Sequence, residues 1–473
     1  MMKHTLLCFL LIICFTLAPN SIQAETKTES ELTDYLEKYL KKERIPGASI
    51  SIVSKGKTIY EYAWGITGED EDNVTPNTPF ALGSISKSFT GLAIAKLIDE
   101  KKLTLDDHVS NYLPPLHLNG AESKITIRHL LTHTSGISSY EGLKVADLGI
   151  EEQIELKTIV QKLSGISLTH EPGSVHQYSA ANYLILGAII EEISAQKFAD
   201  YMEKQIFSPL QMTQTAAGVD MVNRTGYNKG YQSWFGFPVK SKLPYDNSGA
   251  PYSTITSSAK DMSQLILLLS GKRNDAFETS VLNRYTERLY ERKTEDYYGY
   301  GLRHTKLDSG KEIVWHSGST PDAHAELFYI PEEDWGAVIL TNKNHILEES
   351  SLPLLKQGII DIMHGNEPEK IPSYFPTSQL ILVLIVAGLF LWTISLIVKR
   401  KKLNKRKTIL IIGSLSLMIG TIVIPVLIYT TQSPWHSISA FAPDIAFLTV
   451  STVILLAISG LLCFLNYFRR ATN

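Results

Sequence analysis

The stretch ALGSISKSFTGLAIAKLIDEKKL, Ala81 to Leu103, decides how the rest of the chain is interpreted, because a short loop runs directly into a helical pattern. Its first turn places Ser84 and Lys87 three residues apart on one face of the predicted helix. This spacing alone is weak evidence for chemistry, because other pairs share it: Ser54/Lys57, Ser194/Lys197 and Ser257/Lys260. Whether Ser84 and Lys87 form a catalytic pair must therefore be judged from the residues around Ser84.

The N-terminus has the pattern of a secretory signal. Lys3 and His4 precede the apolar run LLCFLLIICFTLA and the segment SIQA, which predicts a signal peptide at 1–24 with cleavage after Ala24. A retained membrane anchor is the alternative, but the apolar run is short for one. Residues 25–379 contain no cysteine, which excludes thiol catalysis and a cysteine-ligated metal there.

The charge of the chain is distributed unevenly. Residues 25–379 carry 35 Lys+Arg against 47 Asp+Glu, a net charge of −12, although the whole chain has a formal charge of only −3. The run KRKKLNKRK, Lys399 to Lys407, holds seven basic residues in nine. Such a run could bind nucleic acid, but it lies between two apolar segments. We therefore interpret it as a determinant of membrane topology and expect no nucleic-acid partner.

Three C-terminal stretches are long and apolar enough to cross a bilayer: 380–398, 408–430 and 445–468. The basic loop 399–407 and the tail 469–473 are expected in the cytoplasm, whereas the loop 431–444 has no Lys or Arg and is expected outside. This orientation agrees with an exported N-terminal part. The sequence thus predicts a multi-pass protein of the cell membrane with an extracellular domain at 25–365 and a Pro-containing linker at 366–379.

Within the extracellular part, strand patterns occur at both ends. ASISIVSKGKTIYEYAWG reads as two strands around a Lys-Gly turn, and GYGLRHT, KEIVWHS, AELFYI and GAVILTN follow near the end. The middle, from Phe89 to about Tyr290, is mostly helical in pattern. We therefore predict an α/β fold in which both termini build one antiparallel sheet around a helical insertion.

Four stretches carry candidate catalytic groups. Ser84 lies at a helix start, where the helix dipole favours a developing alkoxide. A lysine in an apolar, electropositive setting can serve as a base, and a phenol near a lysine is a second base candidate. The corresponding residues are Lys87, Tyr178 in HQYSAANYLILGAIIEEIS, His316-Ser317-Gly318-Ser319 at a strand end, and Asn342 and Asn344 after the last hairpin.

Together with ITIRHLLTHTSGI and SSAKDM, these motifs resemble the penicillin-recognising serine hydrolases related to class C β-lactamases, D-alanyl-D-alanine carboxypeptidases, D-aminopeptidases and esterases. The resemblance covers roughly residues 30–360 and implies a β-lactamase-like fold. It implies that Ser84 is acylated and that Lys87 and Tyr178 move protons. The N–H groups of Ser84 and Ser319 would form the oxyanion hole, and His316-Ser317-Gly318 would take the place of the Lys-Thr/Ser-Gly strand motif. No cofactor is implied.

Two positions depart from the family pattern. The Tyr-x-Asn motif ends here in Ala180, and Asn182 is expected to point elsewhere from its helix. His316 replaces the strand lysine that binds carboxylates in the family, and a histidine is only partly charged at neutral pH. These changes favour amide or ester substrates that lack a free carboxylate. His129 and His133 have metal-ligand spacing, but without further ligands we interpret them as structural.

The sequence therefore predicts a membrane-anchored acyl-serine hydrolase, most readily a peptidase or amidase acting next to D-amino acids. One alternative is a prodrug-activating D-amino peptidase that removes an N-acyl-D-amino acid from a secreted peptide, since these enzymes have a similar layout. Others are an esterase and a non-catalytic β-lactam sensor or binding protein. Expected partners are a small peptide or acyl-peptide, β-lactams and membrane lipid. Three helices, where one would anchor, suggest a homodimer or guidance of a lipophilic substrate.

Overall fold

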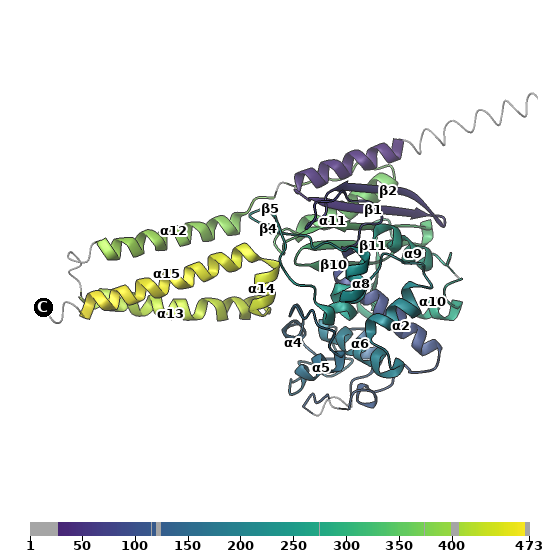
Figure 1. Ribbon diagram of the computed structural model, residues 1–473, viewed down its shortest axis with the longest axis horizontal. Helices are drawn as coiled ribbons and strands as arrows, with labels where there is room; N and C mark the ends of the chain where they lie inside the picture. The colour runs from purple at the N-terminus through teal and green to yellow at the C-terminus, as the bar shows by residue number, and fades with distance from the viewer. Residues whose placement is uncertain are drawn as a thin grey trace, which may run out of the picture.

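The computed structural model describes residues 27–114, 116–119, 124–273, 275–372, 374–398 and 406–468. A globular domain, residues 27–372, is joined to three long helices that extend to one side of it (Figure 1). The predicted signal peptide, most of the basic loop 399–407 and the tail 469–473 lie outside the described residues.

An eight-stranded sheet forms the centre of the globular domain, and every neighbouring pair in it is antiparallel. The N-terminal hairpin β1–β2 joins the sheet beside the last strand, β12, with Ile50 opposite Ile339. The prediction of one antiparallel sheet built from both termini is therefore confirmed. In spatial order the strands are β2 (Lys57–Gly65), β1 (Gly47–Ser54), β12 (Trp335–Thr341), β11 (Ala323–Ile330), β10 (Glu312–Thr320), β9 (Leu302–Lys306), β8 (Asp296–Gly299) and β7 (Tyr290–Lys293).

The two faces of the sheet pack against different layers. The helix at 27–42 and α11 (Leu352–Met363) cover one face, and their cluster includes Ile339. On the other face lie α2 (Ser86–Asp99) and α9 (Ala259–Leu269), and their cluster includes Leu340. Successive side chains of β12 thus enter opposite cores, which explains why this strand is buried throughout.

The helical insertion lies between β2 and β7 and packs on α2. Its helices are α3 (Ile127–Leu131), α4 (Ser139–Lys144), α5 (Leu156–Val160), α6 (Ala180–Ser194), α7 (Phe198–Met202), α8 (Val219–Thr225) and α10 (Thr279–Tyr285). Two small sheets complete the domain. They are β3 (Phe80–Ala81) with β6 (Thr256–Ser257), and β4 (Tyr231–Trp234) between β5 (Phe237–Lys240) and β13 (Lys343–Asn344).

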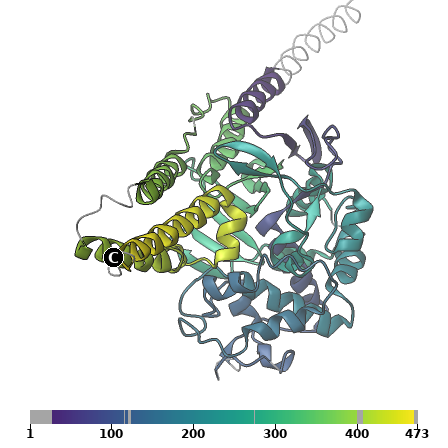
Figure 2. The same cartoon turned by 60° about the vertical axis from the view of Figure 1, so that its left-hand side comes forward.

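The C-terminal helices are α12 (Thr377–Val398), α13 (Arg406–Thr431) and α15 (Pro443–Phe468), and all three are long and apolar enough to cross a membrane. α15 packs between the other two. A Cβ on Gly460 would lie 2.6 Å from Leu417 Cγ, so the glycine allows α15 to pack closely against α13. The predicted outer loop 431–444 contains a further helix, α14 (Trp435–Phe441), which lies against the globular domain (Figure 2).

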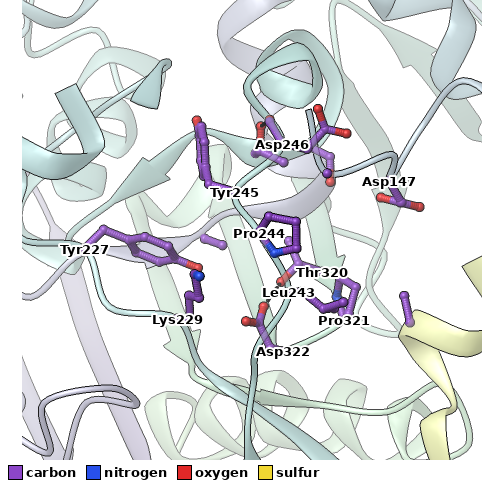
Figure 3. A pocket seen from close by; sticks show the side chains of 15 residues that line it. Asp147, Tyr227, Lys229, Leu243, Pro244, Tyr245, Asp246, Thr320, Pro321 and Asp322 are labelled. Atoms are coloured by element: carbon purple, nitrogen blue, oxygen red, sulfur yellow. Dashed lines mark hydrogen bonds between the residues drawn. The ribbon is translucent and has the colours of Figure 1, made fainter. Parts of the chain in front are cut away.

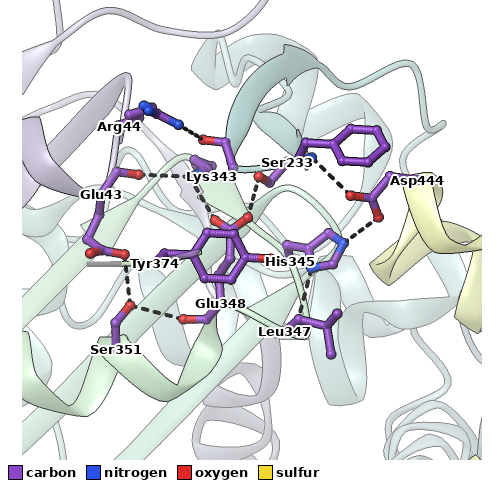
Figure 4. A network of polar contacts seen from close by, with 12 residues as sticks. Glu43, Arg44, Ser233, Lys343, His345, Leu347, Glu348, Ser351, Tyr374 and Asp444 are labelled. Atoms are coloured by element: carbon purple, nitrogen blue, oxygen red, sulfur yellow. Dashed lines mark hydrogen bonds and ion pairs between the residues drawn. The ribbon is translucent and has the colours of Figure 1, made fainter. Parts of the chain in front are cut away.

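A network of polar contacts joins α15 to the globular domain (Figure 4). Asp444, in the first turn of α15, accepts a hydrogen bond from Phe235 N–H at 2.9 Å and pairs with His345 Nε2 at 2.9 Å. Both side chains of that pair are fully buried. Gln232 Nε2 donates to Ala440 O at 2.7 Å. Buried polar groups of this kind fix a single arrangement, so α14 is held against the globular domain by direct bonds.

Candidate active site

Ser84 and Lys87 are placed by a 3₁₀ turn, η1 (Gly83–Ile85), that leads directly into α2. Lys87 is the second residue of α2, and its Nζ lies 3.1 Å from Ser84 Oγ. The same Nζ donates to Tyr252 O at 2.8 Å. Lys87 is only 2% exposed, so its side chain is held between these two oxygens. The helical register that suggested this pair in the sequence therefore produces a direct contact.

Tyr178 lies just before α6, beside the lysine. Lys87 Nζ is 4.7 Å from the centroid of the Tyr178 ring. The Tyr178 hydroxyl is buried, and no described residue lies within hydrogen-bonding distance of it. A buried hydroxyl without a partner is costly, which indicates that a substrate or water atom completes its hydrogen bonding.

His133 supports the loop that carries Tyr178, with their ring centroids 4.2 Å apart. His133 Nδ1 accepts hydrogen bonds from Ser179 N–H at 3.2 Å and Asn182 Nδ2 at 3.0 Å. Burial, reinforced by the charge of Lys87, lowers the pKa of His133 well below its usual value, so the ring is neutral and can accept. Asn182 thus faces His133, in agreement with the prediction that it points away from the substrate. His129 accepts a bond from Thr126 N–H, and no metal-binding cluster occurs among the described residues.

The end of β10 forms another wall of the site around Ser84. β9 pairs with β10 only as far as Trp315, so the edge of residues 316–320 faces η1 instead of a strand. The two segments touch through glycines: a Cβ on Gly318 would lie 2.7 Å from Ser84 N, and a Cβ on Gly83 would lie 2.3 Å from Ser319 N. Gly83 also has a φ of +53°. This close approach brings the Ser84 and Ser319 N–H groups together, as an oxyanion hole requires.

His316 occupies the first position of the strand motif and points beneath the site. It is 2% exposed, and its Nδ1 lies 2.5 Å from Ser317 O while its Nε2 lies 3.3 Å from the Tyr298 hydroxyl. Burial, together with the charges of Arg303 and Lys87, lowers the pKa of His316 well below its usual value. The sequence suggested a partly charged histidine; the structure corrects this to a neutral ring with both nitrogens hydrogen-bonded.

A cavity of about 240 Å³ opens over Ser84. Ser84, Lys87, Tyr178 and Ser319 all line it, together with Ala180, whose small side chain leaves room where the family pattern has an amide. Ser317 is half-buried and Gly318 is covered by η1. The structure thus brings the main predicted groups into one site.

Asn342 and Asn344 lie outside this cavity. Asn342 accepts from Gly47 N–H at 2.7 Å and donates to Ile66 O at 2.8 Å. Asn344 donates to Thr320 O at 2.8 Å. The amides of both residues tie strand ends together, so we assign them structural roles in place of the substrate contact suggested by the sequence.

A second cavity of about 90 Å³ adjoins the first and shares Asp147 and Ser253 with it. Figure 3 shows Asp147 at one side of this second cavity and Tyr227 and Lys229 at the other. Burial, with the nearby charge of Asp246, raises the pKa of Asp147 to about 6. The carboxylate beside the nucleophile was not predicted, because its loop carries no motif.

Phe441 and Leu143 also line the catalytic cavity and were not predicted as site residues. Phe441 belongs to α14, more than 350 positions after Ser84 in the chain. No local pattern connects such distant segments, and in the sequence 431–444 stood out only by its lack of Lys and Arg.

Comparisons with known proteins show which family the chain resembles. The chain matches the protein-family model for β-lactamase over residues 32–354. It is 29% identical over 328 residues to protein Flp of Staphylococcus aureus strain COL, covering 67% of this chain and 64% of that protein, so it spans less than two thirds of its length. The octameric penicillin-binding protein homologue of Pyrococcus abyssi has a TM-score of 0.61 at 26% identity, with 76% and 81% of the two chains covered.

A D-stereospecific amidohydrolase from Streptomyces sp. shares the fold, with a TM-score of 0.55 at 24% identity over 67% of this chain and 94% of that chain. The family-model match spans well over half of the sequence and includes every strand of the large sheet. This match shows that the chain belongs to the β-lactamase family.

Proposed function

We propose that this protein is a membrane-anchored serine hydrolase that forms an acyl-enzyme at Ser84 and cleaves amide bonds next to D-amino acids. The observation that carries the proposal is the 3.1 Å contact between Lys87 Nζ and Ser84 Oγ at the floor of an open cavity. The preference for D-residues follows the penicillin-recognising relatives, and the Streptomyces amidohydrolase suggests the same stereochemistry to test.

In the first step, Ser84 Oγ attacks the carbonyl carbon, and its hydroxyl proton passes to the Lys87–Tyr178 pair. The carbonyl oxygen becomes an oxyanion held by the N–H groups of Ser84 and Ser319. As the C–N bond breaks, the Tyr178 hydroxyl passes a proton to the leaving nitrogen, and Lys87 returns its proton to the tyrosine. Water then attacks the ester and releases the acid, with the same groups accepting and returning its proton.

The neutral His316 indicates which substrates fit. An ammonium at this position would attract a carboxylate, whereas a buried uncharged imidazole with both nitrogens engaged offers no positive charge. We therefore propose substrates without a free carboxylate on the leaving-group side, such as acyl-peptides and amides. The globular domain would lie outside the cell and the C-terminus in the cytoplasm.

Intact mass spectrometry after acid quenching tests this proposal, with wild type compared with Ser84→Ala. Each protein is incubated with a penicillin and, separately, with N-acetyl-D-alanine p-nitroanilide. We expect a Ser84-dependent adduct or turnover with the D-alanyl amide and little with penicillin. Efficient acylation by penicillin alone would favour a cell-wall carboxypeptidase or β-lactamase. The absence of any Ser84-dependent reaction would overturn the proposed hydrolysis of amides.

A further inference from the structure

An apolar cavity of about 630 Å³ lies where the three long helices meet the globular domain. The outer ends of the helices contribute Ile381, Leu427 and Ile445, and the globular domain contributes Leu347. Leu347 is 42% exposed and Ile381 is 54% exposed, so the lining side chains leave hydrocarbon surface open at the boundary of the predicted spans. Pockets of 300–1,000 Å³ are the usual size for ligand sites.

This apolar cavity adjoins the catalytic cavity directly. Leu143 and Phe441 line both of them, so one layer of side chains separates the hydrocarbon-lined space from the space above Ser84. Both residues are only half-buried, which is consistent with free space on two sides of each. Leu143 is in α4 of the insertion and Phe441 is in α14, so the partition forms only where α14 is docked.

Hydrogen bonds hold α14 in its position against the globular domain. His436 Nε2, in α14, lies 3.0 Å from Leu143 O and 3.0 Å from Ala146 O, at the C-terminal end of α4. Ile346 N–H donates to Phe441 O at 3.1 Å on the other side. These bonds fix the backbones on both sides of the partition, and the partition itself consists of the apolar side chains of Leu143 and Phe441.

We propose that the two cavities form one substrate channel. In this channel the apolar cavity of about 630 Å³, called the membrane-side cavity below, holds a long aliphatic chain attached to the acyl side of the scissile bond. The inference rests on the proposed function, since it needs a substrate at Ser84. A cavity of 150 Å³ holds benzene, so 630 Å³ accommodates a chain on the order of a dozen carbons. We assign the aliphatic chain to the substrate and not to a bilayer phospholipid. The apolar cavity leads to Ser84, and the polar headgroup of a phospholipid would not enter this apolar space.

The full-length protein in phosphatidylcholine nanodiscs tests the channel. The substrates are D-alanine p-nitroanilides whose amines carry acetyl, butanoyl, octanoyl or dodecanoyl groups. Burial of one methylene contributes about 0.8 kcal/mol, which sets a ceiling of about fourfold in kcat/KM per carbon. Because the bilayer competes for the chain, we expect about a twofold gain per carbon up to the dodecanoyl substrate.

The deciding readout is the ratio of kcat/KM for the dodecanoyl substrate to that for the acetyl substrate. Ile438→Trp fills the membrane-side cavity, which Ile438 lines, and should lower this ratio at least tenfold. Leu391→Trp is the matched control, because Leu391 lies on α12 outside the cavity with 65% of its surface exposed, and should leave the ratio unchanged. Should Ile438→Trp fail to fold, Leu427→Trp repeats the test from α13.

The outcomes separate the two proposals. A ratio near one in wild type, or an equal ratio in wild type and Ile438→Trp, would overturn the channel even if acetyl substrate is turned over, and the proposed hydrolase would stand. An equally raised ratio in both proteins would mean that the chain simply concentrates substrate in the bilayer. No Ser84-dependent turnover of any chain length would overturn the proposed function and, with it, the channel.

Discussion

Gly318→Ala should disable acylation without unfolding the protein. In an ordinary strand, replacing glycine by alanine is favourable by about 0.5–1 kcal/mol, because the backbone loses less conformational freedom on folding. Here the new Cβ would lie 2.0 Å from Leu82 O and 2.7 Å from Ser84 N. Both partners are backbone atoms, so no side-chain rotation relieves the overlap.

To bring the closest contact to about 3 Å, η1 and β10 must separate by roughly 1 Å. A displacement of this size at reacting groups can reduce the rate about 100-fold, and loss of one oxyanion donor costs about 100- to 1,000-fold. We therefore expect acylation of Ser84 to slow by 100- to 1,000-fold, which corresponds to about 2.7–4 kcal/mol in the activation free energy.

The rate of adduct formation is measured by acid-quenched intact mass, and the midpoint of thermal unfolding is measured in parallel. Gly388→Ala is the control, because a Cβ on that residue of α12 would have no other atom within 4 Å. An acylation rate for Gly318→Ala within threefold of wild type would refute the claim that the η1–β10 contact positions the oxyanion hole.

Three further perturbations test other parts of the structure. Lys87→Met keeps the apolar stem but removes the base, so acylation should fall by about 100- to 10,000-fold in the same mass assay; an unchanged rate would assign the proton transfer elsewhere. The pKa of Asp147 is raised to about 6, so the folded state binds its proton more tightly than the unfolded state and loses stability as pH rises from about 4 to 6. Asp147→Asn should therefore raise the unfolding midpoint at pH 7.5 but not at pH 4, and equal effects at both would contradict this. His345→Ala leaves Asp444 buried without its partner and should destabilise the attachment of α15 by about 3–5 kcal/mol, as measured by chemical denaturation in detergent, whereas the double variant with Asp444→Ala should recover part of that loss.

The sequence predicted those features that depend on local periodicity or on composition. Ser84 and Lys87 are three positions apart in one turn, so helical geometry alone brings their atoms together. The apolar lengths of α12, α13 and α15 likewise exceed what a bilayer requires, and each boundary differs from its prediction by three residues or fewer. Both kinds of information are contained within a single segment.

Contacts between distant segments were predicted less well. Asn342 was considered for substrate binding because it follows a strand near the motif, but its amide bonds to Gly47 and Ile66, which come from the opposite end of the sequence. The pKa of His316 is lowered by burial and by the charges of Arg303, on the neighbouring strand, and Lys87, on α2. A pattern within one strand contains no information on either partner.

The segment 431–444 shows how one sequence feature can have two physical causes. Its lack of Lys and Arg was interpreted as a sign that it lies outside the membrane. In the structure, α14 faces the carbonyl oxygens of Leu143 and Ala146 through His436, and Phe441 lines the catalytic cavity. A long cationic side chain in place of Phe441 would put a charge close to Lys87, where a second ammonium would be repelled. Membrane topology and the electrostatics of the site therefore both favour a segment without Lys and Arg. Only the folded structure shows that this segment forms a wall of the active site and is not merely a connecting loop.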